Sequence, residues 1–329
     1  MSTGLSIILL NYHGLADTVA CLESLRAAEL GTARVLVVEN GSGAEDVAGL
    51  RRWNEGSNFF EEILEIDDHN VFGARPRVHS LLISKENHGF AGGNNLATRI
   101  ARARGDEEVL LLNNDTVVEP DFLSALLAGR DRHPEAVLIP QIRLHARPAT
   151  LWNCGGVLYW PGRKKYNYEN APVATLPVAS DLPVTFVTGC ALLYRPAKTG
   201  LLTERFFFGE EDMEFSWRLR AKGIKAFCIP ASVIYHKVGT SLQSNYRKSE
   251  IFTLKRLVNL RVNVGGTEAV AGYLYYLLNL LRLLTLRYGQ SPLVALRSVY
   301  RVAQNSLRMD AVGEDLCVGY VRRAYLTEE

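Results

Sequence analysis

The chain has 329 residues, of which 47% are hydrophobic and 22% are charged; this excludes wholesale disorder and leaves room for one large α/β domain with additions or for two modest domains. Its formal net charge of +2 gives no overall electrostatic reason to expect nucleic acid as a partner. The charge is unevenly placed, because the chain becomes basic and then strongly apolar from Arg247 onward.

The first forty residues alternate between strand and helix patterns. Leu5–Leu10 is a short continuous apolar run, which is typical of a strand buried on both faces. Asp17–Ala28 repeats apolar residues at helical spacing, with Asp17 as the expected N-cap, and Val35–Glu39 predicts a second buried strand. This order predicts a right-handed βαβ unit and a parallel sheet.

The alternation continues to about residue 140 and predicts a doubly wound, mostly parallel sheet. The further elements are strands at Ser80–Ser84 and Glu108–Leu112 and helices at Gly92–Arg104 and Pro120–Arg130. Later in the chain, Val184–Tyr194 and Ile224–Ile229 each predict a strand.

Two stretches lack this regularity. Trp53–Val78 is polar and irregular, which predicts an excursion on the surface. Trp160–Pro183 is rich in Pro, Asn, Tyr and Lys and is too long for an idle loop in a compact domain. We therefore expect a lid or a binding loop there.

The pattern becomes helical from Ser249. Gly272–Leu286 is very apolar, but Asn279 and Arg282 interrupt it, and it is shorter than the roughly 20 residues that span a bilayer. It is either a buried helix or a helix lying in a membrane interface. Basic residues flank it, as expected beside an anionic surface: Arg247, Lys248, Lys255, Arg256, Arg261, Arg282 and Arg287. The alternative is a helical hairpin packed on the rest of the chain or on the partner in a homodimer.

The cysteines and the first residues bear on location. The five cysteines are widely spaced and form no C-x-x-C pair, which predicts buried free thiols in a reducing compartment: Cys21, Cys154, Cys190, Cys228 and Cys317. The start, MSTGLSIILLNYHG, has no basic region followed by a long apolar stretch. We therefore expect no signal peptide and a cytoplasmic location.

Asn113–Thr116, with the sequence NNDT, directly follows an apolar strand. Polar groups at the carboxyl end of a parallel strand lie where doubly wound sheets bind ligands. A carboxylate with neighbouring amide oxygens suits Mg²⁺ or Mn²⁺ holding a diphosphate. The same residue types are equally common in turns without a ligand.

A glycine-rich segment, Asn87–Asn95, has the sequence NHGFAGGNN and lies between a predicted strand and a predicted helix. Backbone N–H groups in such a segment can approach an anion closely. The segment matches neither the Walker A pattern nor the dinucleotide-binding fingerprint, and a tight turn without a ligand is the alternative.

Four acidic residues follow three phenylalanines in FFFGEEDMEFSWRLRAKG, Phe206–Gly223. A helix N-terminus stabilises acidic side chains, but capping needs only one or two of them. One carboxylate, partly desolvated by Phe206–Phe208, would instead serve as a general base. Further on, His236 ends the apolar run IPASVIYH, where it either completes a metal site or is structural.

These motifs together resemble the family 2 glycosyltransferases, which are inverting, nucleotide-sugar-dependent enzymes with a GT-A fold. In order, they are SIILLNYHG with CLESL, VLVVENGS, NHGFAGGNN, LLLNNDTVV, GEEDMEFSWRLRAKG and VIYHKVGTS, and they are most similar to the rhamnosyltransferase-like and galactofuranosyltransferase-like branch. The resemblance covers Leu5–Ser241. It implies a GT-A catalytic domain over residues 1–245, with a nucleotide-sugar half to about residue 118 and an acceptor half over 119–245. A C-terminal helical region, 246–329, follows.

The resemblance also implies roles for individual residues. The nucleotide-sugar site would comprise Asn11, Tyr12, His13, Glu39, Asn40, Gly41, Ser42, Asn87, Gly89, Phe90, Gly92, Gly93, Asn94 and Asn114. Asp115 is the one acid retained from the family's Asp-x-Asp motif, and with His236 it would bind Mn²⁺ or Mg²⁺. Asp212 matches the catalytic base, with Glu211 before it. The acceptor side would comprise Gly189, Cys190, Glu210 and Trp217, where Cys190 needs no catalytic role.

The function implied by the resemblance is inverting transfer of a sugar from a nucleoside diphosphate to a hydroxyl of a cell-surface glycan or lipid-linked acceptor. The acceptor would lose its proton to Asp212 while a divalent metal stabilises the diphosphate. The protein would act in the cytoplasm, with peripheral binding to the inner face of the membrane as one reading of the C-terminal helices. The alternatives are a nucleotidyltransferase and a catalytically silent scaffold that binds nucleotide sugar.

Overall fold

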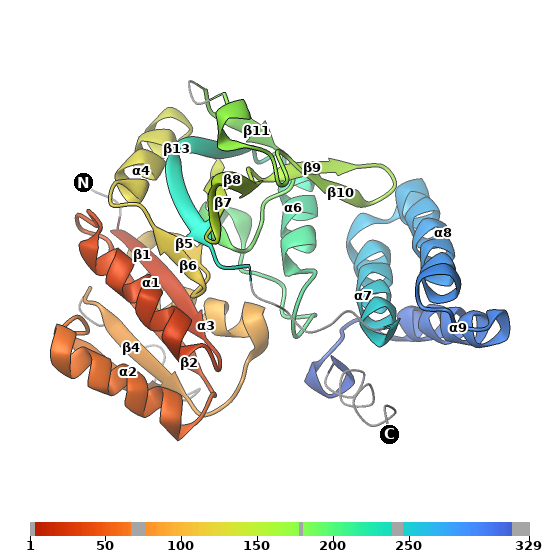
Figure 1. Ribbon diagram of the computed structural model, residues 1–329, viewed down its shortest axis with the longest axis horizontal. Helices are drawn as coiled ribbons and strands as arrows, with labels where there is room; N and C mark the ends of the chain where they lie inside the picture. The colour runs from red at the N-terminus through yellow and green to blue at the C-terminus, as the bar shows by residue number, and fades with distance from the viewer. Residues whose placement is uncertain (1–3, 67–76, 178–179, 239–245, 318–329) are drawn as a thin grey trace.

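The structure is a computed structural model, and it describes residues 4–66, 77–177, 180–238 and 246–317. In this part of the chain an 11-stranded mixed sheet runs through the centre, with the strand order β11-β13-β7-β12-β5-β1-β2-β4-β3 (Figure 1). β6 pairs with β13 and β8 pairs with β7 beside this path. The predicted α/β fold with a C-terminal helical extension is confirmed.

The first part of the chain forms the parallel half of the sheet. Its elements are β1 (Gly4–Asn11), α1 (Leu15–Ala27), β2 (Arg34–Asn40), α2 (Ala44–Ser57), β3 (Glu62–Ile66), β4 (Ser80–Ser84), α3 (Gly89–Ala103), β5 (Asp106–Leu112) and α4 (Phe122–Arg132). β1 pairs in parallel with β2 and β5, and β2 pairs in parallel with β4. The predicted βαβ unit is therefore confirmed.

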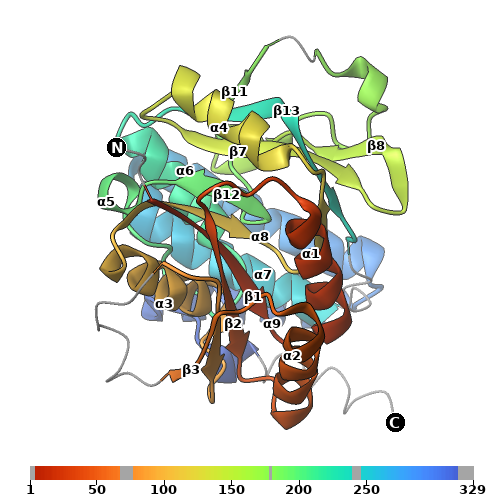
Figure 2. The ribbon, with the colours of Figure 1, turned by 90° about the vertical axis from the view of Figure 1, so that its left-hand side faces the viewer.

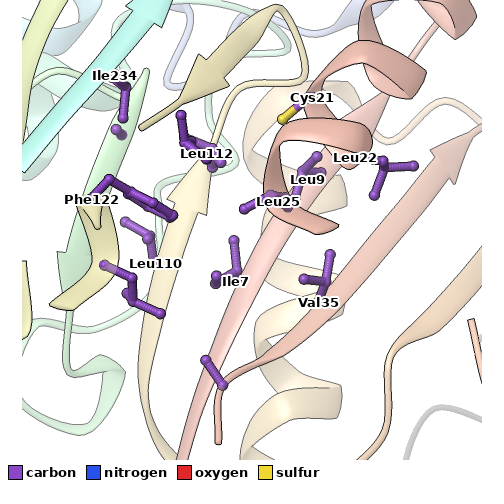
Figure 3. Packing of buried hydrophobic residues seen from close by; sticks show 14 of the residues in the cluster. Ile7, Leu9, Cys21, Leu22, Leu25, Val35, Leu110, Leu112, Phe122 and Ile234 are labelled. Carbon is purple, nitrogen blue, oxygen red and sulfur yellow. The ribbon is translucent and has the colours of Figure 1, made fainter. Parts of the chain in front are cut away.

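Helices cover both faces of this half, which explains why its strands are apolar throughout. Alternate residues of a strand point to opposite faces, so Ile7 and Leu9 pack in one cluster with Leu22 and Leu25 of α1 (Figure 3). Ile8 points the other way and packs in a second cluster that includes residues of α3. Figure 2 shows α3 on the opposite side of the strands from α1 and α2.

The second part of the chain adds antiparallel strands. Its elements are β6 (Thr116–Val118), β7 (Val137–Leu144), β8 (Arg147–Asn153), β9 (Gly156–Tyr159), β10 (Arg163–Tyr166), β11 (Leu182–Val184), β12 (Ala191–Tyr194), α5 (Pro196–Thr199), α6 (Glu211–Ala221) and β13 (Ala226–His236). β12 runs antiparallel to both β5 and β7. β13 runs parallel to β7, and its last residues pair antiparallel with β6.

Two strand predictions differ from the structure. The predicted strand Val184–Tyr194 is two strands, β11 and β12, and the residues between them leave the sheet. The predicted strand Ile224–Ile229 extends to His236, because β13 continues along β7 after a register shift between Ile229 and Val233. As a result, a single strand ends at the histidine.

Two predictions in the first part of the chain were wrong in detail. Asp17 does not cap α1, because the helix already begins at Leu15 and Asp17 lies in its first turn. The predicted excursion Trp53–Val78 begins inside α2 and contains β3, while residues 67–76 lie outside the described part of the chain.

The predicted lid, Trp160–Pro183, contains regular structure. β9 and β10 form an antiparallel hairpin, and the turn between them holds the cis peptide bond Trp160–Pro161. A short 3₁₀ helix, Val173–Thr175, and part of β11 follow, and residues 178–179 lie outside the described chain. The hairpin reaches towards α8 (Figure 1), and the Tyr276 hydroxyl donates to the Gly162 carbonyl at 3.1 Å.

The C-terminal region is helical, as predicted, over its described residues. It comprises α7 (Tyr246–Asn259) with a π-helical continuation (Leu260–Val264), α8 (Gly266–Arg282) with a second one (Leu283–Arg287), and α9 (Pro292–Arg308). These helices share a core of their own, into which the sheet domain inserts Phe206. Residues 318–329 lie outside the described chain.

Two of the basic residues expected beside a membrane are turned inward. Lys255 and Arg256 of α7 are buried, and Arg261 donates to the carbonyls of Ser306 and Met309 near the end of α9. That part of the argument for an anionic surface was wrong, because Lys255 and Arg256 lie on the face of α7 that packs against the sheet domain, while the end of α9 holds Arg261.

The cysteines agree with the prediction of free thiols. Four are buried and Cys317 is half-buried, and none of these described residues forms a disulfide.

Candidate active site

A cavity of about 670 Å³ lies where β1, β2 and β5 end. Parallel strands bring their carboxyl ends to one edge of the sheet, and ligands bind at that edge in doubly wound folds. Nine residues predicted for the donor and metal sites line the cavity: Tyr12, Asn40, Asn87, Gly89, Phe90, Asn94, Asn114, Asp115 and His236. The remaining wall is formed by Leu10, Leu112, Asn113, Trp152, Phe207, Phe208 and Val238.

Asp115 and His236 meet although 121 residues separate them. Asp115 follows β5, and the register of β13 on β6 places His236 opposite Thr116. The Nε2 of His236 lies 3.1 Å from the Oδ2 of Asp115. The other two polar atoms, Asp115 Oδ1 and His236 Nδ1, are buried and have no hydrogen-bond partner within the described chain.

This pair fits a divalent metal. A carboxylate and an imidazole are both ligands for Mn²⁺, and unpartnered buried polar atoms are costly unless something satisfies them. The described residues contain no group of three or more His, Cys, Asp or Glu side chains suited to a metal. The remaining ligands would be substrate phosphate oxygens and water, as is common for Mg²⁺ and Mn²⁺ sites.

Asn40 connects the end of β2 to the glycine-rich segment. Its Nδ2 donates to Asn87 Oδ1 at 2.9 Å and to the Gly89 carbonyl at 3.3 Å, and its Oδ1 accepts from the backbone N–H of His88 at 3.1 Å. These three bonds fix the loop that opens α3. The loop therefore faces the cavity in a defined shape before any ligand binds.

Gly89 shows why this loop needs glycine. Its φ is +68°, and a Cβ there would lie 2.2 Å from the carbonyl oxygen of Phe207. The Phe90 N–H donates to the same carbonyl at 3.2 Å. The loop thus contacts the segment before residues 209–212, which we call the acidic turn. Two motifs more than 110 residues apart therefore form one wall of the cavity. Gly41 and Gly93 are likewise held in close contact, with Glu86 and Leu10 respectively.

Three predicted donor residues, Asn11, Glu39 and Ser42, support the turns behind the cavity and do not line it. Asn11 is buried, donates to Asp46 Oδ2 at 2.9 Å and accepts from the Thr18 hydroxyl at 2.7 Å. Glu39 is buried, and its Oε1 accepts from the Ser42 N–H at 2.8 Å. Glu39 is thus held inside its own turn, and its place in the nucleotide-sugar site stays a prediction.

Tyr12 and His13 are the exposed aromatic residues beside these turns. Tyr12 is 48% exposed and lines the cavity, and its ring centroid lies 4.5 Å from that of His13. The His13 N–H donates to the Ser42 hydroxyl at 3.0 Å. Gly92 does not line the cavity, since it packs on the Cβ of His88.

Glu210 differs from the acceptor contact that we expected. It is 3% exposed and adopts a left-handed φ of 79°. Its two carboxylate oxygens accept from Arg256 at 2.6 and 2.8 Å, and Asn259 donates to it at 3.1 Å. The prediction of an acceptor contact was wrong, because α7 satisfies this carboxylate and holds the turn in a conformation that non-glycine residues rarely adopt.

Asp212 and Glu211 open α6 in different environments. Glu211 is buried, and burial, followed by the nearby Asp212 charge, raises the pKa of its carboxyl group to about 8. Asp212 is half-buried and accepts from Lys164 Nζ of β10 at 3.3 Å. Near neutral pH Glu211 therefore keeps its proton. Neither residue lines the 670 Å³ cavity.

Lys164 is part of a series of contacting side chains between the acidic turn and the pair of Asp115 and His236, which we call the metal-site pair. Its Nζ lies 4.0 Å from the centre of the Phe186 ring and 3.4 Å from the Tyr166 hydroxyl. Burial lowers the pKa of Lys164, but the charge of Asp212 and its other neighbours outweigh this and raise it overall. Lys164 is therefore a cation that neutralises Asp212.

Trp152 of β8 completes the link. Its ring centroid lies 5.8 Å from that of Tyr166 and 4.4 Å from that of His236. Side chains from β8, β10 and β13 thus run in contact from Asp212 to Asp115.

The other residues predicted for the acceptor side lie beneath the site. Cys190 is buried, and its carbonyl accepts from the Asn113 N–H at 2.8 Å. Gly189 allows the Phe90 ring to approach. Trp217 is buried against Phe186. Both side chains belong to the packed interior, and their place on the acceptor side stays a prediction.

Sequence reasoning missed Trp152, Lys164, Tyr166 and Asn259. The first three lie on β8 and β10, which were not predicted. Asn259 lies on a helix distant in sequence. Arg218, in the same motif as the acidic residues, donates to both carboxylate oxygens of Glu214, at 2.9 and 2.7 Å.

Comparison with known proteins agrees with this geometry. The family model described as "Glycosyl transferase family 2" matches residues 6–182. The low-salt glycan biosynthesis hexosyltransferase Agl10 of Haloferax volcanii is 26% identical over 237 residues, which are 68% of this chain and 64% of that protein. The match therefore spans slightly less than two thirds of that relative.

Solved glycosyltransferase structures share the fold. The mannosyltransferase PcManGT from Pyrobaculum calidifontis, in complex with GDP-Man and Mn²⁺, gives a TM-score of 0.52 at 12% identity, covering 99% of this chain and 80% of that one. GalNAc-T7 with UDP, GalNAc and Mn²⁺ gives 0.54 at 11% identity, covering 86% and 57%. The predicted GT-A fold is confirmed, while the rhamnosyltransferase-like branch stays a prediction.

Proposed function

This chain belongs to glycosyl transferase family 2, and from that premise we propose that it is a metal-dependent, inverting glycosyltransferase. It would transfer a sugar, of the hexose class, from a nucleoside diphosphate to a hydroxyl of a cell-surface glycan or lipid-linked acceptor. The observation that carries the proposal is the convergence of Asp115 and His236, with unsatisfied ligand atoms, on a cavity lined by the glycine-rich loop.

The donor would lie along the carboxyl edge of the sheet. Tyr12 would contact the base, and the loop fixed by Asn40 would face the sugar and the diphosphate. Asp115 and His236 would hold Mn²⁺ or Mg²⁺, which stabilises the negative charge of the departing diphosphate. Solved relatives of the same fold contain Mn²⁺ with GDP-Man or UDP, which supports this assignment.

The acceptor would approach from the side of Phe207 and Phe208, which form an apolar wall of the cavity. Its hydroxyl oxygen would attack the anomeric carbon from the face opposite the diphosphate, and the bond from that carbon to the diphosphate oxygen would break. The hydroxyl proton would pass to the carboxylate of Asp212. The products are the glycoside with inverted configuration and the free nucleoside diphosphate.

The environment of Asp212 supports its role as the base. The neighbouring Glu211 is held protonated near neutral pH by its raised pKa of about 8, so the two carboxyl groups do not carry adjacent negative charges. Lys164 lies 3.3 Å from Asp212 and would orient it.

The cellular setting follows from the acceptor. We propose a cytoplasmic protein bound peripherally to the inner face of the membrane, with a homodimer through the C-terminal helices as the alternative. Among the described residues, Gly266–Arg287 is long and apolar enough to cross a membrane by length and composition, and 22% of its most apolar window is buried.

The test begins with the nucleotide. The purified chain is heated with dTDP, UDP or GDP in the presence of Mn²⁺, and one of them is expected to raise the melting temperature in a way that EDTA abolishes. The matching sugar donor is then incubated with acceptor, and the anomeric configuration of the product is determined by NMR. Retained configuration, or transfer that persists in EDTA, would contradict the proposed mechanism.

The same preparation separates the two alternatives left open by the sequence. Release of pyrophosphate from a nucleoside triphosphate and a sugar 1-phosphate would favour a nucleotidyltransferase. Nucleotide binding without donor hydrolysis or transfer in Mn²⁺ would favour a silent scaffold.

A further inference from the structure

A second cavity, of about 550 Å³, lies between α7, α9 and the segment 314–317. Arg247, Arg297 and Arg301 line it together with the carboxylates of Glu250 and Asp315. It shares no lining residue with the cavity proposed for the donor. We propose that this second cavity binds the phosphate group of an anionic lipid and docks the protein on a membrane surface.

Two of the three guanidinium groups are available for an anion. Arg301 is paired, since it donates to Glu250 Oε1 at 3.0 Å. Among the residues that the structure describes, Arg247 donates to the Tyr246 hydroxyl alone, at 3.1 Å. Within the described chain neither Arg247 nor Arg297 forms an ion pair with a carboxylate. Guanidinium groups bind phosphate oxygens through paired N–H donors, so this pair suits a phosphate.

The acidic residues do not cancel this charge. Glu250 is committed to Arg301, and Asp315 forms no ion pair within the described residues. Three guanidinium groups therefore face two carboxylates in the cavity. The cavity therefore has an excess of positive charge, which favours an anion as its ligand over a cation.

The outer surface of α9 supplies the apolar part of the site. Its inner face, Ala295, Ser298, Val302 and Ser306, is buried. Leu293, Leu296, Tyr300 and Leu307 are spaced by three, four and seven residues, so they share one face, and each is between 53% and 64% exposed. The arginines at 297, 301 and 308 are spaced by four and seven residues and form the adjacent row.

An apolar row beside a row of arginines is the pattern of a helix that lies in a membrane interface. Residues 269–308 contain five arginines and no acidic residue. α8 adds a second exposed apolar row at Val270, Leu274 and Leu278. Both the charge and the apolar surface of this region therefore match an anionic lipid surface.

A second copy of the chain fits this face less well. A symmetric dimer brings the same patch of each copy together. Here that would bring the arginine row of α9 against its own equivalent, with no acidic residue on the helix to compensate. Anionic lipids would neutralise these arginines, whereas the arginines of a second copy would repel them.

The inference deepens the proposed peripheral location, and its test is independent of sugar transfer. The full chain is sedimented with vesicles of phosphatidylcholine alone and of phosphatidylcholine mixed with phosphatidylglycerol, without donor or metal. We expect binding to the mixed vesicles only. The double variant Arg247→Gln/Arg297→Gln should weaken that binding by about tenfold.

Arg51→Gln/Arg52→Gln is the matched control, because it removes the same charge from the exposed face of α2 and should bind like the unaltered chain. Leu296→Ser/Leu307→Ser should also reduce vesicle binding. Equal loss of vesicle binding in the two double-arginine variants would show a nonspecific charge effect. That result would overturn the cavity as the lipid site. Tight binding of inorganic phosphate without vesicle binding would assign the cavity to a free anion and overturn the lipid source.

Two more results would overturn the proposal: absence of binding to either vesicle, or a stable dimer in solution that Leu296→Ser/Leu307→Ser dissociates. Transfer to a soluble acceptor should be unchanged in the Arg247→Gln/Arg297→Gln variant. If the unaltered chain binds the mixed vesicles but transfers no sugar, that result counts against the proposed function and leaves the docking site in place.

Discussion

The metal-site pair and the acidic turn are held by different kinds of contact. Asp115 and His236 meet through the register of β5, β6 and β13, so the hydrogen bonds of the sheet place them. Asp212 follows a left-handed turn that the buried pair of Glu210 and Arg256 holds against α7. We therefore expect the proposed donor binding to depend on the sheet, whereas the proposed proton transfer depends on side chains contributed by the hairpin and the C-terminal helices.

The largest effect is expected for Asp212→Asn, which removes the proposed base and keeps its shape. General-base catalysis is worth between a hundredfold and ten thousandfold, so we expect kcat to fall by about a thousandfold while the dissociation constant of the nucleoside diphosphate stays unchanged. Asp131→Asn, on the surface of α4, is the control. A variant that retains full activity would remove Asp212 from the mechanism.

Next in size is the loss of the buried ion pair. Removing one partner of a buried pair leaves an uncompensated charge and costs about 3–5 kcal/mol, so Arg256→Met should lower the free energy of unfolding by that amount in urea titrations. Arg220→Met breaks a surface pair with Glu268 and should cost no more than about 1 kcal/mol.

The double variant Glu210→Gln/Arg256→Met separates charge from packing. It should be more stable than Arg256→Met alone, because the unpaired carboxylate is gone. If Glu210→Gln alone and Arg256→Met alone each lower the free energy of unfolding by no more than Arg220→Met does, this ion pair does not hold the turn. The contrast with the metal-site pair then fails.

Glu211 gives a dependence on pH. Its folded pKa of about 8 lies above the ordinary value of 4.5, so between these values the unfolded chain releases a proton that the folded protein keeps. The contribution of Glu211 to stability is therefore full below about pH 4.5 and is lost as the pH rises towards 8. Glu211→Gln should remove this slope and gain on the order of 3 kcal/mol relative to the unaltered protein near pH 7.

Unfolding curves measured from pH 5 to pH 8 test this, with exposed Glu169→Gln as the control. Parallel pH profiles for Glu211→Gln and the unaltered chain would show that Glu211 is already ionised in the folded state.

The smallest effect is expected at the hairpin. Lys164→Met removes the cation that lies against Asp212, and we expect about a tenfold fall in kcat with little change in the KM of the donor. Its neighbour Lys165 is exposed on the same strand, so Lys165→Met should leave both constants unchanged. A rise in KM without a fall in kcat would place Lys164 in donor binding instead.

The same contrast explains what the sequence could predict. The apolar runs around Ile7 and Val35, with a helix between them, predict the parallel half of the sheet, because strands buried on both faces are apolar throughout. Asp115 could be placed at a strand end from local pattern, and His236 could be placed at the end of another. Each of these predictions needs only a short window of sequence.

The partners of the acidic turn could not be predicted in this way. Arg256 lies 46 residues beyond Glu210 and was counted among cations facing a membrane, because sequence shows that a residue is charged but not what it pairs with. Trp152 and Lys164 lie on short strands whose pairing depends on β7 and β9. Long-range pairing of this kind leaves little signal in local periodicity.

The most direct test of the account compares Asp115→Asn with Asp212→Asn in one experiment. Binding of the nucleoside diphosphate is measured by calorimetry as Mn²⁺ is titrated, and transfer is measured in the same buffer. We expect Asp115→Asn to abolish the Mn²⁺-dependent gain in nucleotide affinity, whereas Asp212→Asn should keep that gain and lose transfer. Unchanged Mn²⁺ dependence in Asp115→Asn would contradict this expectation.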